Sequence, residues 1–162
     1  MAKKRTGGTP ATVLLERLGV PFTVHEYEHD PATPSYGTEA ADVLGVDRDR
    51  VFKTLVVTVD GRLSVAVVPV SASLDLKALA TACGGKRAAM AEPADAQRSS
   101  GYVVGGISPL GQRRPLPTVV DDSAWRFPTI LVSGGRRGFD LELAPDALVA
   151  ATSGVAATIA RR

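Results

Sequence analysis

The stretch Val51-Phe52-Lys53-Thr54-Leu55-Val56-Val57-Thr58-Val59 is the strongest fold signal in this chain. Nine residues rich in β-branched and aliphatic types are typical of a β-strand. They end at Asp60-Gly61, a pair that favours a type I′ hairpin turn. The residues that follow, 62–70, are mostly Val and Ala and predict a second, buried strand. We therefore expect a hairpin at the centre of the protein.

Lys53 stands out within this strand. Because side chains alternate across a pleat, Lys53 shares one face with Val51, Leu55, Val57 and Val59, so a single ammonium interrupts an apolar row. Such a lysine either reaches solvent at the strand end or lies over a pocket whose ligand supplies negative charge or carbonyl acceptors. The spacing alone leaves both interpretations open.

Length and composition indicate one ordinary globular domain. The chain has 162 residues, of which 44% are hydrophobic and 22% charged. Aromatic residues make up only 5%, which argues against an extended stacking surface for single-stranded nucleic acid. A formal net charge of +2 is too small to indicate nucleic-acid binding by itself. We expect a flexible basic tail over residues 1–8 and a single domain over residues 9–162.

The cysteine and histidine content limits the possible chemistry. Cys83 is the only cysteine, which excludes an internal disulfide and fits a reducing compartment. It falls in the last turn of a predicted helix and is interpreted as a packing residue. His25 and His29 would lie roughly 13 Å apart along a strand at about 3.3 Å per residue, so no shared metal is expected unless the chain turns between them. No apolar run is long enough to cross a membrane, and we expect a cytoplasmic protein without a membrane partner.

The remaining patterns predict helices and strands without a regular βαβ repeat. Helices are expected at residues 10–18, 39–44 capped by Thr38, 74–83 capped by Ser73, 93–99 and 145–152. Strands are expected at residues 22–27, 51–59, 62–70, 86–90, 117–121, 129–132 and 139–143, with a strand from residue 102 entering a glycine-rich loop and a short strand or helix at 155–161. These elements predict an α/β (α+β) domain with a mixed, mostly antiparallel sheet of about seven strands flanked by helices.

Two glycine-rich segments are candidates for ligand contacts. Gly105-Gly106 would let backbone N–H groups approach a ligand closely, as in an oxyanion or carbonyl site. A second glycine-rich turn occupies residues 133–138. Neither segment has the pattern of a dinucleotide-binding loop or a P-loop. After the second turn, alternation places Asp140 and Glu142 opposite an apolar set of side chains.

Four of these motifs together resemble the YbaK family of prolyl-tRNA editing-type deacylases. The resemblance runs from about Thr9 to Arg161 and rests on Tyr27-Glu28-His29-Asp30-Pro31, Val51-Phe52-Lys53-Thr54-Leu55, residues 104–112 and residues 132–138. It implies a YbaK-like editing fold and a free-standing cytoplasmic enzyme that hydrolyses mischarged Cys-tRNA(Pro) beside prolyl-tRNA synthetase. An enzyme of this kind is needed because cysteine and proline are close in size. A difference of one small group in an apolar synthetase pocket changes the binding free energy by only about 1–3 kcal/mol, so some tRNA is mischarged.

The resemblance also implies a mechanism in which the substrate supplies the nucleophile. The cysteinyl thiol attacks its own ester carbonyl and gives a cyclic thiolactone and free tRNA. This agrees with a sequence that offers no Ser-His-Asp or Cys-His pattern. No protein nucleophile and no cofactor are then required.

The site residues follow from the same resemblance. The essential lysine corresponds to Lys53, which would hold the aminoacyl group or the terminal nucleotide and stabilise carbonyl charge. The backbone of Gly106 corresponds to the carbonyl contact, and Asp140 would pair with the substrate α-ammonium. The other implied pocket residues are Tyr27, Tyr36, Thr54 and Ser133, and the implied phosphate contacts are Arg113, Arg136 and Arg137. Tyr27 and Tyr36 would enclose a small side chain, although Tyr36 replaces the phenylalanine of this family.

Other functions remain open at this point. The same fold could deacylate another mischarged species such as Ala-tRNA(Pro), or the chain could be a non-catalytic module that binds tRNA or the synthetase. The partners that the resemblance implies are aminoacylated tRNA(Pro) and prolyl-tRNA synthetase. The sequence leaves the oligomeric state open between a monomer and a weak dimer.

Overall fold

The computed structural model describes residues 8–32 and 36–162. The predicted basic tail lies, apart from its last residue, outside the described residues. The helices are α1 (Pro10–Leu18), α2 (Tyr36–Leu44), α3 (Leu76–Ala82), α4 (Pro93–Ser100) and α5 (Pro145–Thr152), with a 3-10 turn η1 (Asp122–Arg126). The strands are β1 (Thr23–Glu26), β2 (Phe52–Val59), β3 (Arg62–Pro69), β4 (Ser73–Leu74), β5 (Ala88–Met90), β6 (Thr118–Asp121), β7 (Ile130–Arg136), β8 (Phe139–Leu143), β9 (Val155–Ala157) and β10 (Ala160–Arg161).

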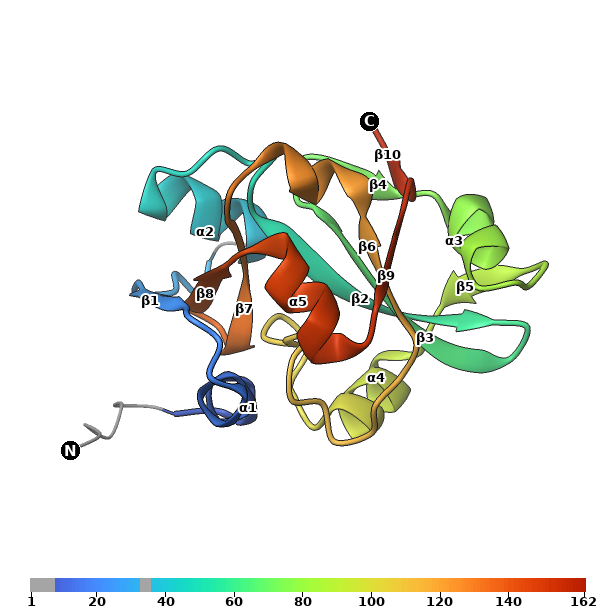
Figure 1. The fold of residues 1–162 in the computed structure, drawn as a ribbon, viewed down its shortest axis with the longest axis horizontal. Coiled ribbons are helices and arrows are strands. Elements are labelled where there is room, and N and C mark those ends of the chain that lie inside the picture. The colour runs from blue at the N-terminus through green and yellow to red at the C-terminus, as the bar shows by residue number, and fades with distance from the viewer. Residues whose placement is uncertain (1–7, 33–35) are drawn as a thin grey trace.

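The strands form a mixed sheet, as the sequence predicted. A five-stranded sheet has the order β5-β2-β3-β6-β9, in which β3-β6 and β6-β9 are parallel and the other pairs antiparallel. A three-stranded antiparallel sheet has the order β1-β8-β7, and β4 pairs with β10 (Figure 1). The fold class is confirmed. The described residues contain ten strands rather than about seven, because β4, β9 and β10, each of only two or three residues, also pair.

The predicted central hairpin is confirmed. Strands β2 and β3 pair along their whole length, from Phe52 opposite Pro69 to Val59 opposite Arg62. The turn residues Asp60 and Gly61 have φ values of 51° and 83°, as a type I′ turn requires. The hairpin therefore forms the middle of the five-stranded sheet.

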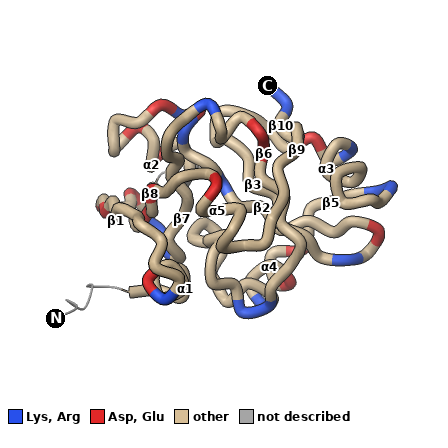
Figure 2. The backbone as a smooth tube through the Cα atoms, viewed as in Figure 1, with Lys and Arg blue, Asp and Glu red and all other residues tan. Residues whose placement is uncertain are grey.

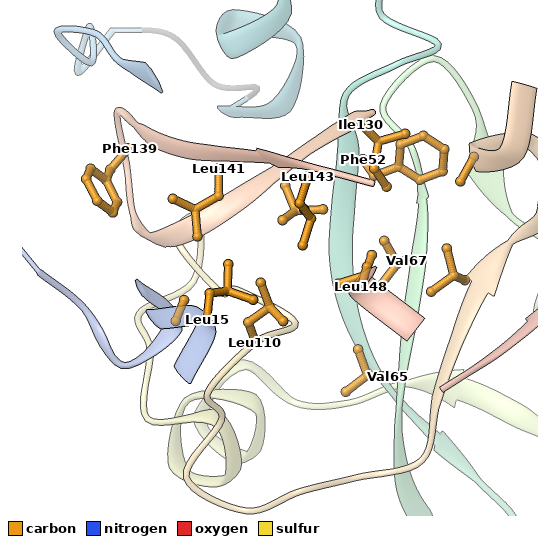
Figure 3. Close-up of a cluster of buried hydrophobic side chains, with 14 residues drawn as sticks. Leu15, Phe52, Val65, Val67, Leu110, Ile130, Phe139, Leu141, Leu143 and Leu148 are labelled. Atoms are coloured by element: carbon orange, nitrogen blue, oxygen red, sulfur yellow. The ribbon is translucent and has the colours of Figure 1, made fainter. Parts of the chain in front are cut away.

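Helices cover both faces of this sheet. On one face, α1 and α5 enclose a core with the three-stranded sheet, and Figure 3 shows Leu15 and Leu148 pointing into it. On the other face, α3 packs Leu79 and Ala80 against β2 and β3. Strand β3 supplies both clusters, with Val65 and Val67 in the first and alternating residues in the second. This is why β3 has an uninterrupted apolar sequence.

The start of α1 follows its sequence signal closely. The Thr9 hydroxyl accepts from the Thr12 N–H, the Thr12 hydroxyl accepts from the Thr9 N–H, and Pro10 occupies the first turn. Gly19, with a φ of 70°, ends the helix. Local chemistry alone sets both ends of this helix.

Three local predictions are wrong in detail. Helix α2 begins at Tyr36, so Thr38 lies within it and does not cap it. Ser73 belongs to β4, because residues 73–74 pair with β10, and the cap of α3 is Asp75, whose carboxylate accepts from the Ala78 N–H. Cys83 was expected in the last turn of this helix, but α3 ends at Ala82 and Cys83 is its C-terminal cap residue. It packs against the second core cluster.

The segment 102–112 forms a loop where a strand was expected. Tyr102 is buried and its hydroxyl donates to the Leu110 carbonyl at 2.6 Å, which closes the loop on itself. Ile107 and Leu110 are buried in two different core clusters. The apolar residues of this segment therefore anchor a folded loop and do not alternate along a strand.

Candidate active site

A gap in the pairing of β2 creates the site. At one end the Leu131 N–H donates to the Arg50 carbonyl, and at the other the Ala91 N–H donates to the Val56 carbonyl. In a strand, the backbone N–H and C=O groups of every second residue point to the same side. Arg50 and Val56 accept on this side, so the backbone groups of Thr54, which lies between them at the same spacing, point there as well. Within the described residues no strand pairs with this side of β2 between Lys53 and Leu55. The middle of the central strand is thus an open edge between β7 and β5.

A cavity of about 350 Å³ lies over this open edge. Its polar side chains come mainly from β2 and the β7–β8 hairpin, and its apolar lining comes from β2, α2, β5, α4 and the glycine-rich loop. Six predicted site residues line it besides Lys53: Tyr27, Thr54, Ser133, Arg136, Arg137 and Asp140. The structure therefore brings together most of the residues that the sequence singled out from four separate segments.

Lys53 is half-buried in this cavity. Burial lowers the pKa of its ammonium, because a low-dielectric environment disfavours the charged form. In the described part of the chain, no carboxylate lies within ion-pair distance of this ammonium. Of the two interpretations left open by the spacing, the geometry favours a lysine over a pocket.

Asp140 lies in the same cavity and is almost fully buried. Burial raises the pKa of its carboxyl group to about 7. Strand pairing places Asp140 directly opposite Ser133 of β7, and the two side chains share a face of the sheet. The Asp140 charge in turn contributes, after burial, to raising the pKa of Tyr27 to about 12.

Thr54 carries an unpaired polar atom. Its hydroxyl oxygen is buried and has no hydrogen-bond partner among the described residues. A buried hydroxyl without a partner costs free energy, so such an atom in a cavity is suited to a ligand. Thr54 therefore offers a bound molecule its hydroxyl and the backbone groups of an open strand edge.

The glycine-rich loop differs from the expectation in one respect. The Gly106 N–H donates to the Val103 carbonyl at 2.8 Å, so it is already occupied within a turn. A side chain at Gly106 would meet the backbone of Arg136 at 2.7 Å, which explains the glycine. Gly105, with a φ of 94°, lines the cavity instead and is the better candidate for a backbone contact. The resemblance identified the loop and assigned the contact to Gly106, whereas the structure has Gly105 in the cavity lining.

The β7–β8 hairpin closes another side of the cavity. A bulge at Gly134-Gly135 shifts the strand register, so that Arg136 pairs with Phe139. The turn residue Gly138 must lack a side chain, because a Cβ there would lie 2.4 Å from the Tyr27 carbonyl oxygen. Tyr27 is held at this turn, since its N–H donates to the Gly138 carbonyl.

The three predicted phosphate contacts differ in their positions. Arg136 forms an ion pair with Glu26 at 3.4 Å and lies over the Phe139 ring, and Arg137 donates to the Val104 carbonyl at 2.9 Å. Both are exposed at the cavity. Arg113 is exposed but does not line the cavity. Lys and Arg are spread around the molecule and do not form one basic face in this view (Figure 2).

Tyr27 and Tyr36 were expected to form an aromatic wall of the pocket, and of these two side chains only that of Tyr27 is described. Tyr36 begins α2, but its side chain lies outside the described part of the structure. Sequence reasoning missed a contact that holds this wall in place. Glu39 of α2 accepts from the Asp30 N–H and bonds His29 Nδ1 at 2.7 Å. The carboxylate thus ties the segment after Tyr27 to the helix whose Gly37 and Ala40 line the cavity.

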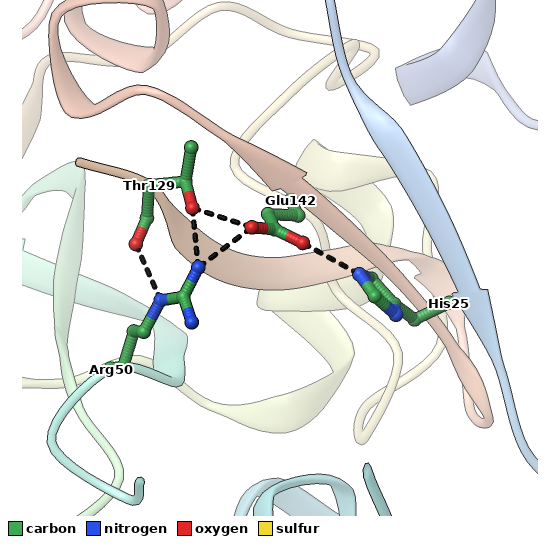
Figure 4. A network of polar contacts seen from close by, with 4 residues as sticks. All are labelled: His25, Arg50, Thr129 and Glu142. Atoms are coloured by element: carbon green, nitrogen blue, oxygen red, sulfur yellow. Dashed lines mark hydrogen bonds and ion pairs between the residues drawn. The ribbon is translucent and has the colours of Figure 1, made fainter. Parts of the chain in front are cut away.

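A second missed feature is the polar network of Figure 4. Glu142 of β8 bonds His25 of β1 and Arg50, each at 2.7 Å, and also accepts from Thr129. Arg50 in addition donates to the Thr129 carbonyl. Hydrogen bonds from Thr129 and His25, together with the Arg50 charge, hold the pKa of Glu142 below its usual range. The network joins the start of β2 to β8, the strands that carry Lys53 and Asp140.

Among the described residues there is no group of three or more His, Cys, Asp or Glu side chains able to hold a metal ion. No helix in the described ranges has the length and apolar character needed to span a membrane. The polar groups that line the cavity are the Lys53 ammonium, the Asp140 carboxyl group, several hydroxyls, two guanidinium groups and backbone groups.

Comparisons with known proteins point to one family. The family model described as an aminoacyl-tRNA editing domain matches residues 30–151. The chain is 40% identical over 163 residues to EbsC of Enterococcus faecalis, with 98% of each chain covered, and EbsC is named as a proposed Cys-tRNA(Pro)/Cys-tRNA(Cys) deacylase. Among solved structures, one described as a proposed trans-editing enzyme for prolyl-tRNA synthetase is 25% identical and superposes with a TM-score of 0.82, covering 94% of this chain and 96% of the other. The hypothetical protein APE2540 is 26% identical with a TM-score of 0.84, covering 94% and 100%.

Proposed function

Because the chain belongs to the aminoacyl-tRNA editing domain family, as its sequence motifs had indicated, we propose that it hydrolyses Cys-tRNA(Pro) in trans. It is an aminoacyl-tRNA deacylase, and its substrate is therefore an aminoacylated tRNA. One observation carries the proposal for the site. A half-buried ammonium and a buried carboxyl group line the same cavity without an ion-pair partner among the described residues.

An aminoacyl ester complements these two groups. Its α-ammonium pairs with the Asp140 carboxylate, and its ester carbonyl accepts from Lys53. A positive charge brought beside Asp140 lowers the pKa of the carboxyl group and keeps it ionised at neutral pH. The hydroxyl of Thr54 and the N–H of Gly105 supply further hydrogen bonds to the bound aminoacyl group. In this arrangement the substrate, and not the protein, satisfies the charges of the cavity.

The proposed reaction uses the substrate thiol as nucleophile. The thiol sulfur attacks the ester carbonyl carbon, and the carbonyl oxygen gains negative charge that Lys53 stabilises. The bond from the carbonyl carbon to the ribose oxygen then breaks, and that oxygen takes up the proton that the thiol has lost. A cyclic thiolactone and free tRNA leave, and water opens the thiolactone to cysteine.

Prolyl-tRNA synthetase is the proposed partner, because it is the enzyme whose mischarging would supply this substrate. Its active site alone cannot reject a similarly small amino acid strongly, so a second site with different chemistry is required. A reaction that depends on the substrate thiol provides such a difference. Proline has no thiol, and correctly charged Pro-tRNA(Pro) therefore survives.

Deacylation assays with tRNA(Pro) charged with Cys, Ala or Ser test the proposal. We expect Cys-tRNA(Pro) to be hydrolysed at least about a hundredfold faster than the Ser ester, since a hydroxyl is a far weaker nucleophile than a thiol. Faster hydrolysis of the Ala ester would contradict the substrate-assisted route and assign the site to Ala-tRNA(Pro). Adding prolyl-tRNA synthetase tests the partnership, with a lower KM expected.

A further inference from the structure

The mouth of the cavity has an apolar side that the proposed chemistry does not use. Met90 of β5, Pro93 of α4 and Val104 of the glycine-rich loop line the cavity and are exposed. Met90 is 51% exposed and Val104 38%, and the neighbouring Val103 is 65% exposed. Exposed apolar groups gathered at the edge of a pocket are typical of a ligand-binding surface.

The opposite side of the mouth is basic. Arg136 and Arg137 of the β7–β8 hairpin are exposed and line the same cavity. The two sides meet at one hydrogen bond, from the Arg137 guanidinium to the Val104 carbonyl. An apolar surface and two guanidinium groups therefore lie next to each other at one opening.

The apolar side is held in place by three hydrogen bonds. The Val104 N–H donates to the Gln97 side chain of α4, and its carbonyl accepts from Arg137. The Ala91 N–H, next to Met90, donates to the Val56 carbonyl of β2. The main chain at Val104 and next to Met90 is thus fixed relative to the open edge of β2, so a ligand need not order it on binding.

The covalent structure of the substrate decides what must lie there. An aminoacyl group is esterified to the terminal ribose of tRNA, so an amino acid seated in the cavity leaves the attached nucleoside at its mouth. A base presents a flat apolar face, and the phosphodiester on the other side of the ribose presents negative charge. These requirements match the apolar side and the arginine side respectively.

We propose that Met90, Pro93 and Val104 form a shelf that binds the face of the terminal adenine, with Arg136 and Arg137 beside the last phosphodiester. This proposal rests on the proposed deacylase function. It adds a nucleoside subsite to the aminoacyl subsite around Lys53. The enzyme then recognises the end of tRNA through the nucleoside next to the scissile ester.

Two small esters isolate the shelf from the rest of tRNA recognition. Cysteine ethyl ester carries only the aminoacyl group, whereas 3′-O-cysteinyl-adenosine adds the nucleoside without any phosphate. The measured quantity is the ratio of kcat/KM for the adenosine ester to kcat/KM for the ethyl ester. We expect a ratio well above one for the natural protein, and a ratio about tenfold smaller in Met90→Asp and in Val104→Asp, because a carboxylate replaces an apolar contact.

Matched variants separate the shelf from general damage. Val155→Asp places the same charge on an exposed valine of β9 that does not line the cavity, and it should leave the ratio unchanged. Met90→Leu keeps the apolar contact and should also preserve the ratio. A ratio near one in the natural protein, or an unchanged ratio in both shelf variants, overturns the shelf. If the natural protein cleaves neither ester nor Cys-tRNA(Pro), the proposed function fails and the shelf fails with it.

Discussion

Two pairs of opposite charges each combine a residue at or just before the start of β2 with a residue of β8, but only one of the pairs forms an ion pair. Arg50 and Glu142 bond each other, and His25 and Thr129 complete their hydrogen bonding (Figure 4). Lys53 and Asp140 line one cavity but do not form an ion pair. Arg50 and Lys53 are three residues apart in the sequence, and Asp140 and Glu142 are two residues apart.

The difference separates a structural pair from a pair available to a ligand. A charge that loses water without gaining a partner costs free energy, and the raised pKa of Asp140 is the sign of that cost. The pKa of Glu142 moves in the other direction, because its partners favour the ionised form. We infer that the network fixes the two strands so that the cavity can keep its charges free for an aminoacyl ester.

Removing the cavity ammonium should produce the largest effect. Lys53→Met retains the apolar part of the side chain and loses the charge. We expect the rate of Cys-tRNA(Pro) deacylation to fall by about 10²–10³, the usual effect of removing a positioned electrostatic donor. The free energy of unfolding, measured by urea denaturation, should not decrease. Residual activity within a fewfold of the natural protein would remove Lys53 from the mechanism.

Ionisation of Asp140 should improve substrate binding and lower the stability of the folded protein. Ionised Asp140 is needed to hold the α-ammonium, so KM for Cys-tRNA(Pro) should fall as pH rises through about 7. In Asp140→Asn this pH dependence should disappear and KM should be about tenfold or more higher at pH 8.

The same carboxyl group should cost stability at high pH. Its folded-state pKa of about 7 exceeds the unfolded value, so the folded protein binds the extra proton. The contribution of Asp140 to the free energy of unfolding is therefore fully present below about pH 4 and declines as pH rises to about 7. Asp140→Asn should raise the free energy of unfolding at pH 8 by about 1–3 kcal/mol. A loss of stability in Asp140→Asn would show that the carboxylate is structurally paired.

Breaking the closed network should have the reverse outcome. Glu142→Gln leaves Arg50 without its carboxylate, and we expect the free energy of unfolding at pH 7 to fall by about 1–3 kcal/mol. The low pKa of Glu142 means that this contribution is present at neutral pH and is lost as pH falls through the folded-state pKa. Deacylation should fall by only about two- to tenfold, since Glu142 does not line the cavity. A loss as large as that of Lys53→Met would place the network in the catalytic site.

The smallest effect is expected at Cys83. It caps α3 and packs behind the sheet, and it does not line the cavity. Cys83→Ser should retain at least about half of the deacylation rate, with a modest loss of stability of about 1 kcal/mol. Loss of activity in a folded Cys83→Ser protein would mean that the enzyme, and not the substrate, supplies the thiol.

Local signals in the sequence predicted the parts of the fold that depend on neighbouring residues. The hairpin at Asp60-Gly61 and both ends of α1 are examples, because turn and cap chemistry act over a few residues. Ser73 was misassigned because its strand pairing is with Arg161, far along the chain. Segment 102–112 was misassigned because its apolar residues anchor a loop in two separate clusters.

The site was predictable to a similar extent. Alternation singled out Lys53, and family resemblance added the other polar side chains of the cavity lining: Tyr27, Thr54, Ser133, Arg136, Arg137 and Asp140. The bond between Arg50 and Glu142 joins residues that are 92 positions apart, and no local pattern marks it. The shelf at Met90 and Val104 likewise combines two segments that only the folded chain brings together. The choice between Gly105 and Gly106 depends on one turn hydrogen bond that composition does not reveal.

The most direct test is an NMR titration of the Asp140 carboxyl carbon in the free protein and with a non-hydrolysable cysteinyl-adenosine amide. We expect a pKa of about 7 in the free protein, and a decrease of about one unit or more when the ligand ammonium is bound. An analogue lacking the α-amino group should bind without that decrease. A free-protein pKa near 4, or the same pKa with and without the amino-bearing ligand, would contradict the claim that the cavity keeps its charges unpaired for the substrate.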